Sequence, residues 1–249
     1  MMNGNNIERR NAIVMGATSG LGRAIAISLS RLGWKVAIAG RRVEMLQQLY
    51  AEEANIVGYR QIDITAANST DELLAFIESV GGIDLYVHCS GIGYHNNAVE
   101  PSLEESTVVT NGVGFVKMVG CVYRYFSGQL MGGHIAVVSS IAGVRGLGAA
   151  PAYSATKRMQ NTYIDALVQN ANMRRLGVTF TDIRPGFIET DLLKGKKYPL
   201  CMSLDYASNL IVKSIEKRKR AVIVDWKYRL VVFLWRLIPQ RMWERMHIG

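Results

Sequence analysis

Three glycines lie between a short apolar run and a helical pattern, and they constrain the fold of this chain more than any other feature of its sequence. The apolar run covers residues 11–15, the glycines are Gly16, Gly20 and Gly22, and the helical pattern covers residues 21–32. In a strand–turn–helix unit, glycines let the backbone approach a pyrophosphate, and the helix N-terminus supplies free N–H groups and a partial positive charge. The same spacing also fits a tight turn that merely needs small residues. The flanking strand and helix favour nucleotide binding.

The rest of the chain alternates between apolar runs and helical patterns. We expect strands at residues 11–15, 35–39, 56–60, 84–88, 133–139, 177–183 and 221–224, and helices at residues 21–32, 43–54, 70–80, 101–129 and 151–176. This alternation predicts an α/β protein: a Rossmann-like doubly wound sheet of about seven mostly parallel strands with helices on both faces. A length of 249 residues is enough for one large domain of this kind. We expect residues 1–249 to form a single Rossmann-type domain.

Residues with possible chemical roles follow the ends of the predicted strands. In sheets of this kind the ligand lies outside the carboxyl ends of the strands. The residues that follow those ends are Gly16, Arg41, Asp63, Gly91, Ser140 and Pro185. We therefore expect one site at that edge of the sheet.

Tyr153 and Lys157 lie four residues apart in a predicted helix, so they share one face of it. A neighbouring ammonium favours the phenolate of Tyr153 and lowers its pKa towards the range in which acid–base catalysis is efficient. Ser140 closes an apolar run, and its hydroxyl could meet the same carbonyl oxygen from a second side. The alternative is that the aromatic ring packs beneath the lysine stem.

The second predicted strand ends in Arg41 and Arg42, with no acidic residue beside them. In dinucleotide-binding folds an acid near this point holds the ribose 2′-hydroxyl, whereas an arginine accommodates a 2′-phosphate. Guanidinium groups match phosphate geometry, so the pair favours NADP(H) over NAD(H) as cofactor. The alternative is a solvated pair of surface arginines.

The positive charge of the chain is concentrated near its C-terminus. The formal net charge is +9, and residues 213–249 hold ten Lys or Arg against three Asp or Glu, which is +7. A nucleic-acid-binding protein would need a wider basic surface or a binding motif, so we expect no nucleic-acid partner and place Lys217–Arg220 at a solvated helix end. The three cysteines are far apart in sequence, which predicts no metal site and a cytoplasmic protein. The polar residues 1–10 predict no secretory signal.

The segment 228–246 combines apolar and basic residues. Leu230, Phe233, Leu234, Leu237 and Ile238 recur at helical spacing, four arginines punctuate them, and Pro239 breaks the pattern. The run is too short to span a bilayer. It either packs against protein or lies at a membrane surface with its arginines at the head groups. The second explanation implies a membrane-peripheral protein with a long-chain keto substrate.

Together these residues resemble the short-chain dehydrogenase/reductase family, over a core of about residues 10–225 that leaves 226–249 as an extension. Residues 15–22 match the family's glycine motif, with Met15 in place of its threonine. Residues 88–91 match its Asn-Asn-Ala-Gly segment poorly, because Cys89 replaces an asparagine, and residues 185–190 match its Pro-Gly-x-x-x-Thr segment. The catalytic tetrad of the family is complete as Asn111, Ser140, Tyr153 and Lys157.

The resemblance implies a set of cofactor-binding residues. They are Gly16, Thr18, Ser19, Gly20, Leu21, Gly22, Arg41, Arg42, Asp63, Ile64, Cys89, Ser90, Gly91, Tyr153, Lys157, Pro185, Gly186, Ile188 and Thr190. It also implies a substrate pocket built from residues 92–98, 141–150 and 187–203. Its expected lining is Tyr94, His95, Val144, Leu147, Leu192, Leu193, Tyr198 and Met202. A homodimer or homotetramer is expected on the same ground.

The activity implied by the resemblance is hydride transfer between NADPH and the carbonyl carbon of a small-molecule ketone or aldehyde, or the reverse from the alcohol. Tyr153 donates the proton, and Ser140 bonds the same oxygen. Lys157 lowers the tyrosine pKa and bonds the nicotinamide ribose, and Asn111 holds a water that resupplies the proton. Two alternatives stay open. One is a non-catalytic NADP-binding regulator, and the other is a membrane-surface reductase of a lipid-like keto substrate.

Overall fold

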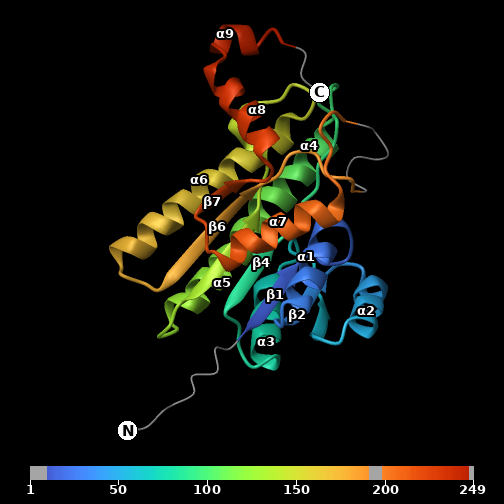
Figure 1. Cartoon of the computed structure of the whole chain (residues 1–249), viewed down its shortest axis with the longest axis vertical. Coiled ribbons are helices and arrows are strands. Elements are labelled where there is room, and N and C mark those ends of the chain that lie inside the picture. The colour runs from blue at the N-terminus through green and yellow to red at the C-terminus, as the bar shows by residue number, and fades with distance from the viewer. Residues whose placement is uncertain (1–9, 191–197, 247–249) are drawn as a thin grey trace.

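Seven parallel strands form one sheet in the computed structural model, which describes residues 10–190 and 198–246 (Figure 1). The strands are β1 (Asn11–Met15), β2 (Lys35–Gly40), β3 (Ile56–Gln61), β4 (Leu85–His88), β5 (Gly133–Val138), β6 (Val178–Arg184) and β7 (Ala221–Ile223). Their order in the sheet is β3-β2-β1-β4-β5-β6-β7, and every neighbouring pair among them is parallel. The predicted doubly wound fold is confirmed.

Helices cover both faces of this sheet. They are α1 (Gly20–Arg31), α2 (Val43–Glu52), α3 (Ser69–Ser79), α4 (Pro101–Val108), α5 (Phe115–Ser127), α6 (Pro151–Met173), α7 (Leu204–Glu216), α8 (Trp226–Leu237) and α9 (Gln240–Trp243). A π-helical turn, η1 (Val109–Gly114), joins α4 to α5, and a 3-10 turn, η2 (Ile141–Val144), follows β5. The helices α1, α2, α7 and α8 share one hydrophobic core, and α3, α5 and α6 share the other.

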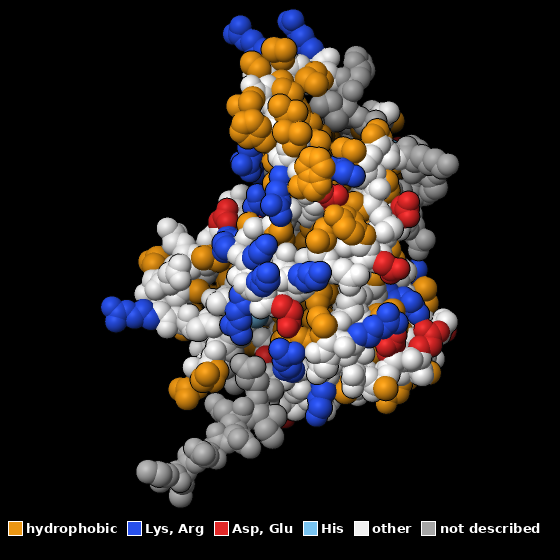
Figure 2. Space-filling model, viewed as in Figure 1, with side chains coloured by type: hydrophobic (Ala, Val, Ile, Leu, Met, Phe, Trp, Pro, Cys, Tyr) orange, Lys and Arg blue, Asp and Glu red, His pale blue; other side chains and the backbone are white. Residues whose placement is uncertain are grey.

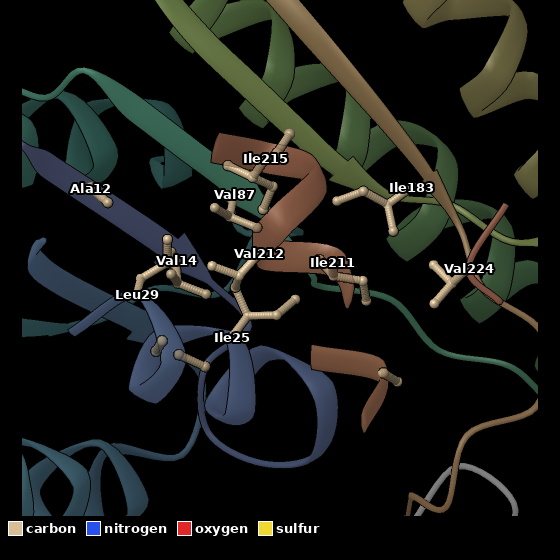
Figure 3. Close-up of a cluster of buried hydrophobic side chains, with 14 of the residues drawn as sticks. Ala12, Val14, Ile25, Leu29, Val87, Ile183, Ile211, Val212, Ile215 and Val224 are labelled. Carbon is tan, nitrogen blue, oxygen red and sulfur yellow. The ribbon is translucent and has the colours of Figure 1, made fainter. Parts of the chain in front are cut away.

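Alternation along the strands supplies both cores. In β1, Ala12 and Val14 face the core of α1 and α7, whereas Ile13 and Met15 face the core of α3, α5 and α6. Figure 3 shows the first core, where side chains of α1 and α7 meet those of β1 and β4. Because both faces of a parallel strand are covered, its sequence is a nearly continuous hydrophobic run.

Two helical regions differ from the sequence-based expectation. The single helix expected at 101–129 is interrupted by the π-helical turn, which contains Gly112 and Gly114. A side chain at Gly114 would begin 2.9 Å from Ile64 Cγ1, so the backbone runs close to its neighbour there. Helix α7 was not among the expected helices. The basic run 217–220 follows directly after it, at the expected solvated helix end.

The C-terminal segment forms two helices with a break between them. Helix α8 ends at Leu237 and α9 starts at Gln240, so the break falls at Pro239 as the sequence predicts. Both helices lie above the β6–β7 edge in Figure 1. Among the helices within residues 10–190 and 198–246, none combines the length and the apolar character needed to cross a bilayer.

Candidate active site

The glycine turn after β1 has the geometry of a phosphate cradle. Gly16 has φ +89°, and a Cβ there would lie 2.7 Å from the backbone nitrogen of Ser90, so only glycine fits. A Cβ at Gly22 would lie 2.1 Å from the carbonyl oxygen of Gly16. Ser19, at the N-terminus of α1, makes no side-chain capping bond, and the first turn of α1 holds no acidic residue. The turn therefore presents a close backbone approach and a helix N-terminus to an anion.

Arg42 lies against the same turn. Its guanidinium donates to Thr18 Oγ1 at 2.7 Å and to Ser19 Oγ at 2.6 Å, which brings a cation to the start of α1. Arg41 is exposed at the end of β2, beside a cavity of about 340 Å³ that Asp63 also lines. Burial acts to raise the pKa of Asp63, but hydrogen bonds from Thr65 and the charge of Arg41 outweigh it and hold that pKa below its usual value. The donors and charges at this end fit an anionic nucleotide.

The end of β4 brings uncharged buried groups beneath the site. His88 is buried with Nδ1 3.0 Å from the Tyr86 hydroxyl, and its Nε2 is without a hydrogen-bond partner among the described residues. Burial, with the nearby Lys157 charge, lowers the pKa of His88 to about 3. Burial raises the pKa of the Cys89 thiol to about 12. His88 is therefore a neutral imidazole and Cys89 a protonated thiol near neutral pH. The replacement of the family's asparagine by Cys89 leaves the strand before it intact, because β4 pairs with β5 up to His88.

Ser140 and Tyr153 meet at the end of β5. Ser140 is the N-cap of η2, and its Oγ accepts a hydrogen bond from the Ala142 N–H at 3.1 Å. Burial raises the pKa of the Tyr153 phenol, and a hydrogen bond with Ser140 partly offsets this rise. Gly93 lies against the tyrosine ring, where a Cβ would begin 2.8 Å from Cδ2. The loop after β4 thus covers one face of the ring.

Lys157 is buried beside this pair. Its Nζ donates to Val138 O at 3.0 Å and to Gln160 Oε1 at 3.2 Å, and it lies 5.7 Å from the centroid of the Tyr153 ring. Burial lowers the pKa of Lys157 to about 8, and the charge of Asp182 opposes that shift. Lys157 is therefore mostly an ammonium at neutral pH and loses its proton in mildly alkaline solution.

The net pKa of Tyr153 differs in direction from the sequence-based expectation. The ammonium lies over the ring, and it donates hydrogen bonds to Val138 and Gln160. The pKa of Tyr153 is raised, because burial disfavours a phenolate more than the site favours it. Sequence spacing places the two residues side by side but gives no measure of burial.

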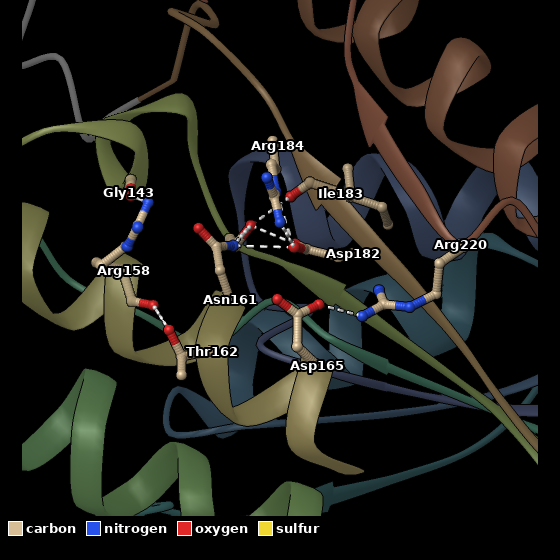
Figure 4. Close-up of polar contacts among 10 residues, drawn as sticks. Gly143, Arg158, Asn161, Thr162, Asp165, Asp182, Ile183, Arg184 and Arg220 are labelled. Atoms are coloured by element: carbon tan, nitrogen blue, oxygen red, sulfur yellow. Dashed lines mark hydrogen bonds and ion pairs between the residues drawn. The ribbon is translucent and has the colours of Figure 1, made fainter. Parts of the chain in front are cut away.

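Asp182 supplies the negative charge behind Lys157. It is fully buried, and its carboxylate accepts from Ser139 Oγ at 2.5 Å, Asn161 Nδ2 at 2.9 Å and Arg184 Nε at 2.8 Å (Figure 4). Four donor groups on three residues thus surround one carboxylate, since the second Arg184 nitrogen also contacts it. A buried carboxylate needs such partners, because water cannot reach it.

Gln160 joins Lys157 to Asn111, and the sequence-based reasoning missed it. Its Oε1 accepts from Lys157 Nζ, and its Nε2 donates to the carbonyl oxygen of Asn111 at 2.8 Å. The partners fix the orientation of this amide, because an ammonium can only donate and a carbonyl can only accept. The signal was present: a polar residue three positions after Lys157 shares its helix face.

The Asn111 side chain is also occupied by protein groups. Its Oδ1 accepts from the Ile92 N–H at 2.9 Å, and its Nδ2 donates to the Ile92 carbonyl at 2.7 Å. Asn111 therefore fastens the loop after β4 to the π-helical turn. The backbone carbonyl of Asn111 accepts from the Gln160 amide, so this oxygen too is bonded to a protein group.

The segment after β6 returns to the glycine turn. A Cβ at Gly20 would lie 3.5 Å from Thr190 Cγ2, so Thr190 lies beside the turn. Gly186 lies flat on Tyr228 of α8, where a Cβ would come within 2.2 Å of the ring. The Tyr228 hydroxyl accepts from the Phe187 N–H and donates to the Leu200 carbonyl, both at 3.0 Å. The C-terminal extension therefore supports the segment Pro185–Thr190.

Part of the expected substrate pocket comes together as an aromatic stack. The Tyr198 hydroxyl lies 2.6 Å from His95 Nε2, and the Tyr198 ring stacks on Phe187 at a centroid distance of 4.1 Å. Ile188 and Met202 pair through a β-bridge. Leu192 and Leu193 lie outside the described residues. The expected cofactor-binding residues outside α6 lie at the carboxyl ends of the strands. They belong to the glycine turn after β1, to the segments that follow β2, β3 and β4, and to the segment that follows β6.

Comparison with known proteins agrees with this geometry. The family model for short chain dehydrogenases matches residues 10–198. An uncharacterized oxidoreductase of Myxococcus xanthus is 32% identical over 244 residues, which cover 94% of this chain and 95% of the relative. An uncharacterized oxidoreductase of Mycobacterium tuberculosis is 27% identical over 251 residues, with coverage of 96% and 98%.

Solved structures share the fold at lower identity. A short chain dehydrogenase from Burkholderia cenocepacia, solved in complex with NADP, superposes with a TM-score of 0.81 at 19% identity and covers 96% of this chain and 98% of that one. A serine dehydrogenase complexed with NADP+ gives a TM-score of 0.76 at 24% identity, covering 86% and 93%. With the family model matching most of the chain and a full-length relative above 30% identity, the protein belongs to the short chain dehydrogenase family of oxidoreductases.

Proposed function

We propose that this oxidoreductase reduces a ketone or aldehyde to an alcohol with NADPH, or catalyses the reverse, and that Tyr153 is its acid–base residue. One observation supports this above the others: the Ser140 hydroxyl, the Tyr153 phenol and the Lys157 ammonium converge at the carboxyl end of β5. A hydrogen-bond donor, a proton donor and a stabilising cation at one point are what carbonyl reduction needs.

NADP(H) is proposed as the cofactor in preference to NAD(H). Arg41 and Arg42 stand at the end of β2, where an acid would hold an unphosphorylated ribose. Arg42 already contacts the glycine turn through Thr18 and Ser19. Two solved structures with the same fold were determined in complex with NADP. The glycine turn and the segments after β3, β4 and β6 would hold the rest of the cofactor, and when bound it supplies the hydride.

Ser140 and Tyr153 would act on the carbonyl oxygen. Ser140 Oγ accepts from the Ala142 N–H, which fixes the oxygen, and its hydroxyl hydrogen would turn from Tyr153 to the substrate oxygen when the substrate binds. The raised pKa of Tyr153 keeps the phenol protonated before reaction, as a proton donor requires. When the proton leaves, the Lys157 ammonium 5.7 Å from the ring centroid stabilises the phenolate.

Gln160 would hold Lys157 in this arrangement. The side chain spans from the ammonium to the Asn111 carbonyl, and both ends are buried in the molecule. A primary amide in this place orients the ammonium, but it does not exchange protons as readily as a water does. We infer that Gln160 is a positioning residue and that the Lys157 proton is replaced by another route than a water on Asn111.

The test is Tyr153→Phe, with Tyr163→Phe on the same helix as the matched control. Removing the proton donor should lower kcat for carbonyl reduction by roughly 10³-fold, within the usual range for acid–base groups. NADPH affinity, measured by fluorescence titration, should stay nearly unchanged. A Tyr153→Phe variant that keeps most of its rate removes the assignment. NADPH that binds but is not consumed across a panel of aldehydes and ketones would instead indicate the non-catalytic regulator.

A homodimer or homotetramer is proposed through α4, η1 and α6. Val108, Val113 and Met159 lie on these elements with 46%, 54% and 42% of their surface exposed. Exposed apolar side chains of this size favour burial between subunits. Light scattering after size exclusion should give a mass of two or four chains, and a single-chain mass would exclude this assembly.

A further inference from the structure

Helix α8 is apolar on two opposite faces. Tyr228 and Val232 are buried, at 3% and 1% exposure, and pack in the core that α7 shares. On the other face, large apolar side chains are between 51% and 65% exposed: Trp226, Leu230, Phe233, Leu234 and Leu237. The two expected explanations of this segment therefore describe different faces of the same helix. Packing accounts for the first face and leaves the second without a partner among the described residues.

The exposed face is a continuous stripe with basic residues along both margins. At 3.6 residues per turn its five side chains fall within an arc of about 100°. On the same helical projection Lys227 lies at one margin, and Arg229 and Arg236 lie at the other. All three are exposed, as are Arg241 and Arg245 beyond the break. Figure 2 shows hydrophobic side chains gathered over α8 and α9, with Lys and Arg side chains at their tip.

This stripe is held next to the proposed substrate pocket. Arg145, which follows η2, donates to the carbonyl oxygens of Arg236 and Ile238 and to Gln240 Oε1. The Trp243 indole N–H donates to the Gly146 carbonyl at 2.8 Å. Tyr228 supports the segment after β6 through Phe187. Helices α8 and α9 thus attach to two of the three segments expected to line the pocket.

We propose that the exposed face of α8 docks on an anionic membrane surface and that the substrate is a lipid-like, long-chain carbonyl compound drawn from that surface. Leu230, Phe233 and Leu237 enter the boundary between head groups and acyl chains, and the flanking cations contact anionic head groups. The long stems of the arginines let their charge stay at head-group level. The substrate class rests on the proposed carbonyl reduction, whereas the docking does not.

The positive charge of this face favours an anionic membrane over a second copy of the chain as its partner. A two-fold contact through this face would bring Lys227, Arg229 and Arg236 against the same residues of the other copy. Glu244 is the one acidic residue between residues 226 and 246, and it already accepts from Gln240. Like charges that meet at a closing interface repel. An anionic surface offers opposite charge over the whole stripe.

The experiment is flotation of the full-length protein with vesicles of phosphatidylcholine, alone or with roughly a quarter phosphatidylglycerol. We expect binding to the anionic vesicles, at least about tenfold weaker binding to neutral ones, and weakening by salt. Phe233→Glu should lower the affinity for anionic vesicles by at least about tenfold. Leu130→Glu is the matched control, because Leu130 is fully exposed on the turn after α5, and it should bind as the wild type does.

Catalysis gives the second arm. Phe233→Glu should keep the wild-type rate on a short water-soluble carbonyl compound and lose about tenfold in kcat/KM on a long-chain aldehyde presented in vesicles. Absence of vesicle binding in the wild type overturns the docking, as does a Phe233→Glu variant that changes the mass in light scattering, since that marks a face between copies. Vesicle binding without turnover of any carbonyl leaves the docking intact and overturns only the proposed reaction.

Discussion

The surroundings of Lys157 and the outer face of α8 are opposite exceptions to the rule that polar groups lie outside and apolar groups inside. Around Lys157, an ammonium, a carboxylate and two amides are buried, and each finds a partner within the protein. On α8, five large apolar side chains are exposed. Buried polar groups need internal partners because water cannot reach them. Exposed apolar groups have no such internal solution, so they indicate a partner outside the chain.

The two regions therefore specify function in different ways. The polar cluster is a closed network, and its chemistry can be derived from this one chain. The α8 face is an open half of a contact, and its chemistry is complete only with a second surface. Variants that treat the two regions alike should therefore give unlike results.

The largest expected effect is in the polar cluster. Asp182→Ala removes the carboxylate that pairs with Arg184 and faces Lys157, so it leaves buried donors without an acceptor. We expect a loss of about 3–5 kcal/mol in the free energy of unfolding, measured by urea denaturation. Asp165→Ala is the matched control, because Asp165 pairs with Arg220 in an exposed ion pair of the same kind (Figure 4), and its loss should be about 1 kcal/mol or less. Equal losses would show that the Asp182 network adds nothing to an ordinary ion pair.

A smaller effect separates two adjacent residues of α8. Val232→Ala deletes buried methyl groups and should lower the free energy of unfolding by about 2 kcal/mol. Phe233→Ala truncates an exposed ring and should change it by about 0.5 kcal/mol or less in the absence of membranes. Thermal or urea unfolding of both variants measures the contrast. If Phe233→Ala proves as costly as Val232→Ala, the outer face of α8 is already covered in solution.

The smallest effect concerns Gln160 and is read from pH. The pKa of Lys157, about 8 because of burial, predicts that carbonyl reduction falls as pH rises through about 8 and the ammonium is lost. Gln160→Leu removes an acceptor from the ammonium, which lowers this pKa further and moves the alkaline limb to lower pH. Gln160→Glu adds a carboxylate and moves the limb to higher pH. The rate at neutral pH should fall about tenfold in Gln160→Leu, equal to one lost hydrogen bond to a charged group.

Opposite shifts of the pH limb distinguish positioning of Lys157 from a merely structural role. The other groups that face the ammonium are Asp182, His88, Cys89 and Tyr153, and none of them changes in these variants. Carbon-13 NMR of the lysine side chain reports the same titration without turnover, so it separates a fault in this assignment from a fault in the proposed reaction. Exposed Gln48→Leu serves as the control. Shifts in the same direction for both Gln160 variants would contradict the assignment.

The periodic part of the sequence predicted most of the fold. Every expected strand exists, and each boundary lies within one residue of the expected one, because strands covered on both faces are runs of apolar residues between turns. The helix at 101–129 was predicted as continuous, and the π-helical turn within it was not predicted. Helix α7 was not predicted, although Ile211 and Ile215 lie four residues apart on one helix face and pack in the core.

At the candidate site, the sequence predicted which residues lie together, but it did not predict the direction of the Tyr153 pKa shift or the hydrogen bonds of Gln160. Ser140, Tyr153 and Lys157 do come together. Burial sets the pKa of Tyr153, and burial depends on Gly93 and the loop after β4, which are remote in sequence. The Gln160 bridge depends on the position of the Asn111 carbonyl, forty-nine residues earlier in the chain. Such contacts follow from tertiary packing, which periodicity does not encode.

The π-helical turn Val109–Gly114 changes the direction in which side chains face along the continuous helical segment formed by α4, the turn and α5. One added residue advances every later side chain by about 100° around the axis. Helix α4 can therefore face α6 while α5, on the same segment, faces α3 and the sheet. Deleting a single residue there would straighten the segment and turn α4 and α5 out of phase with one of these neighbours. Residue 111 lies at the point of that change, so the count of residues in one turn determines whether its carbonyl meets Gln160.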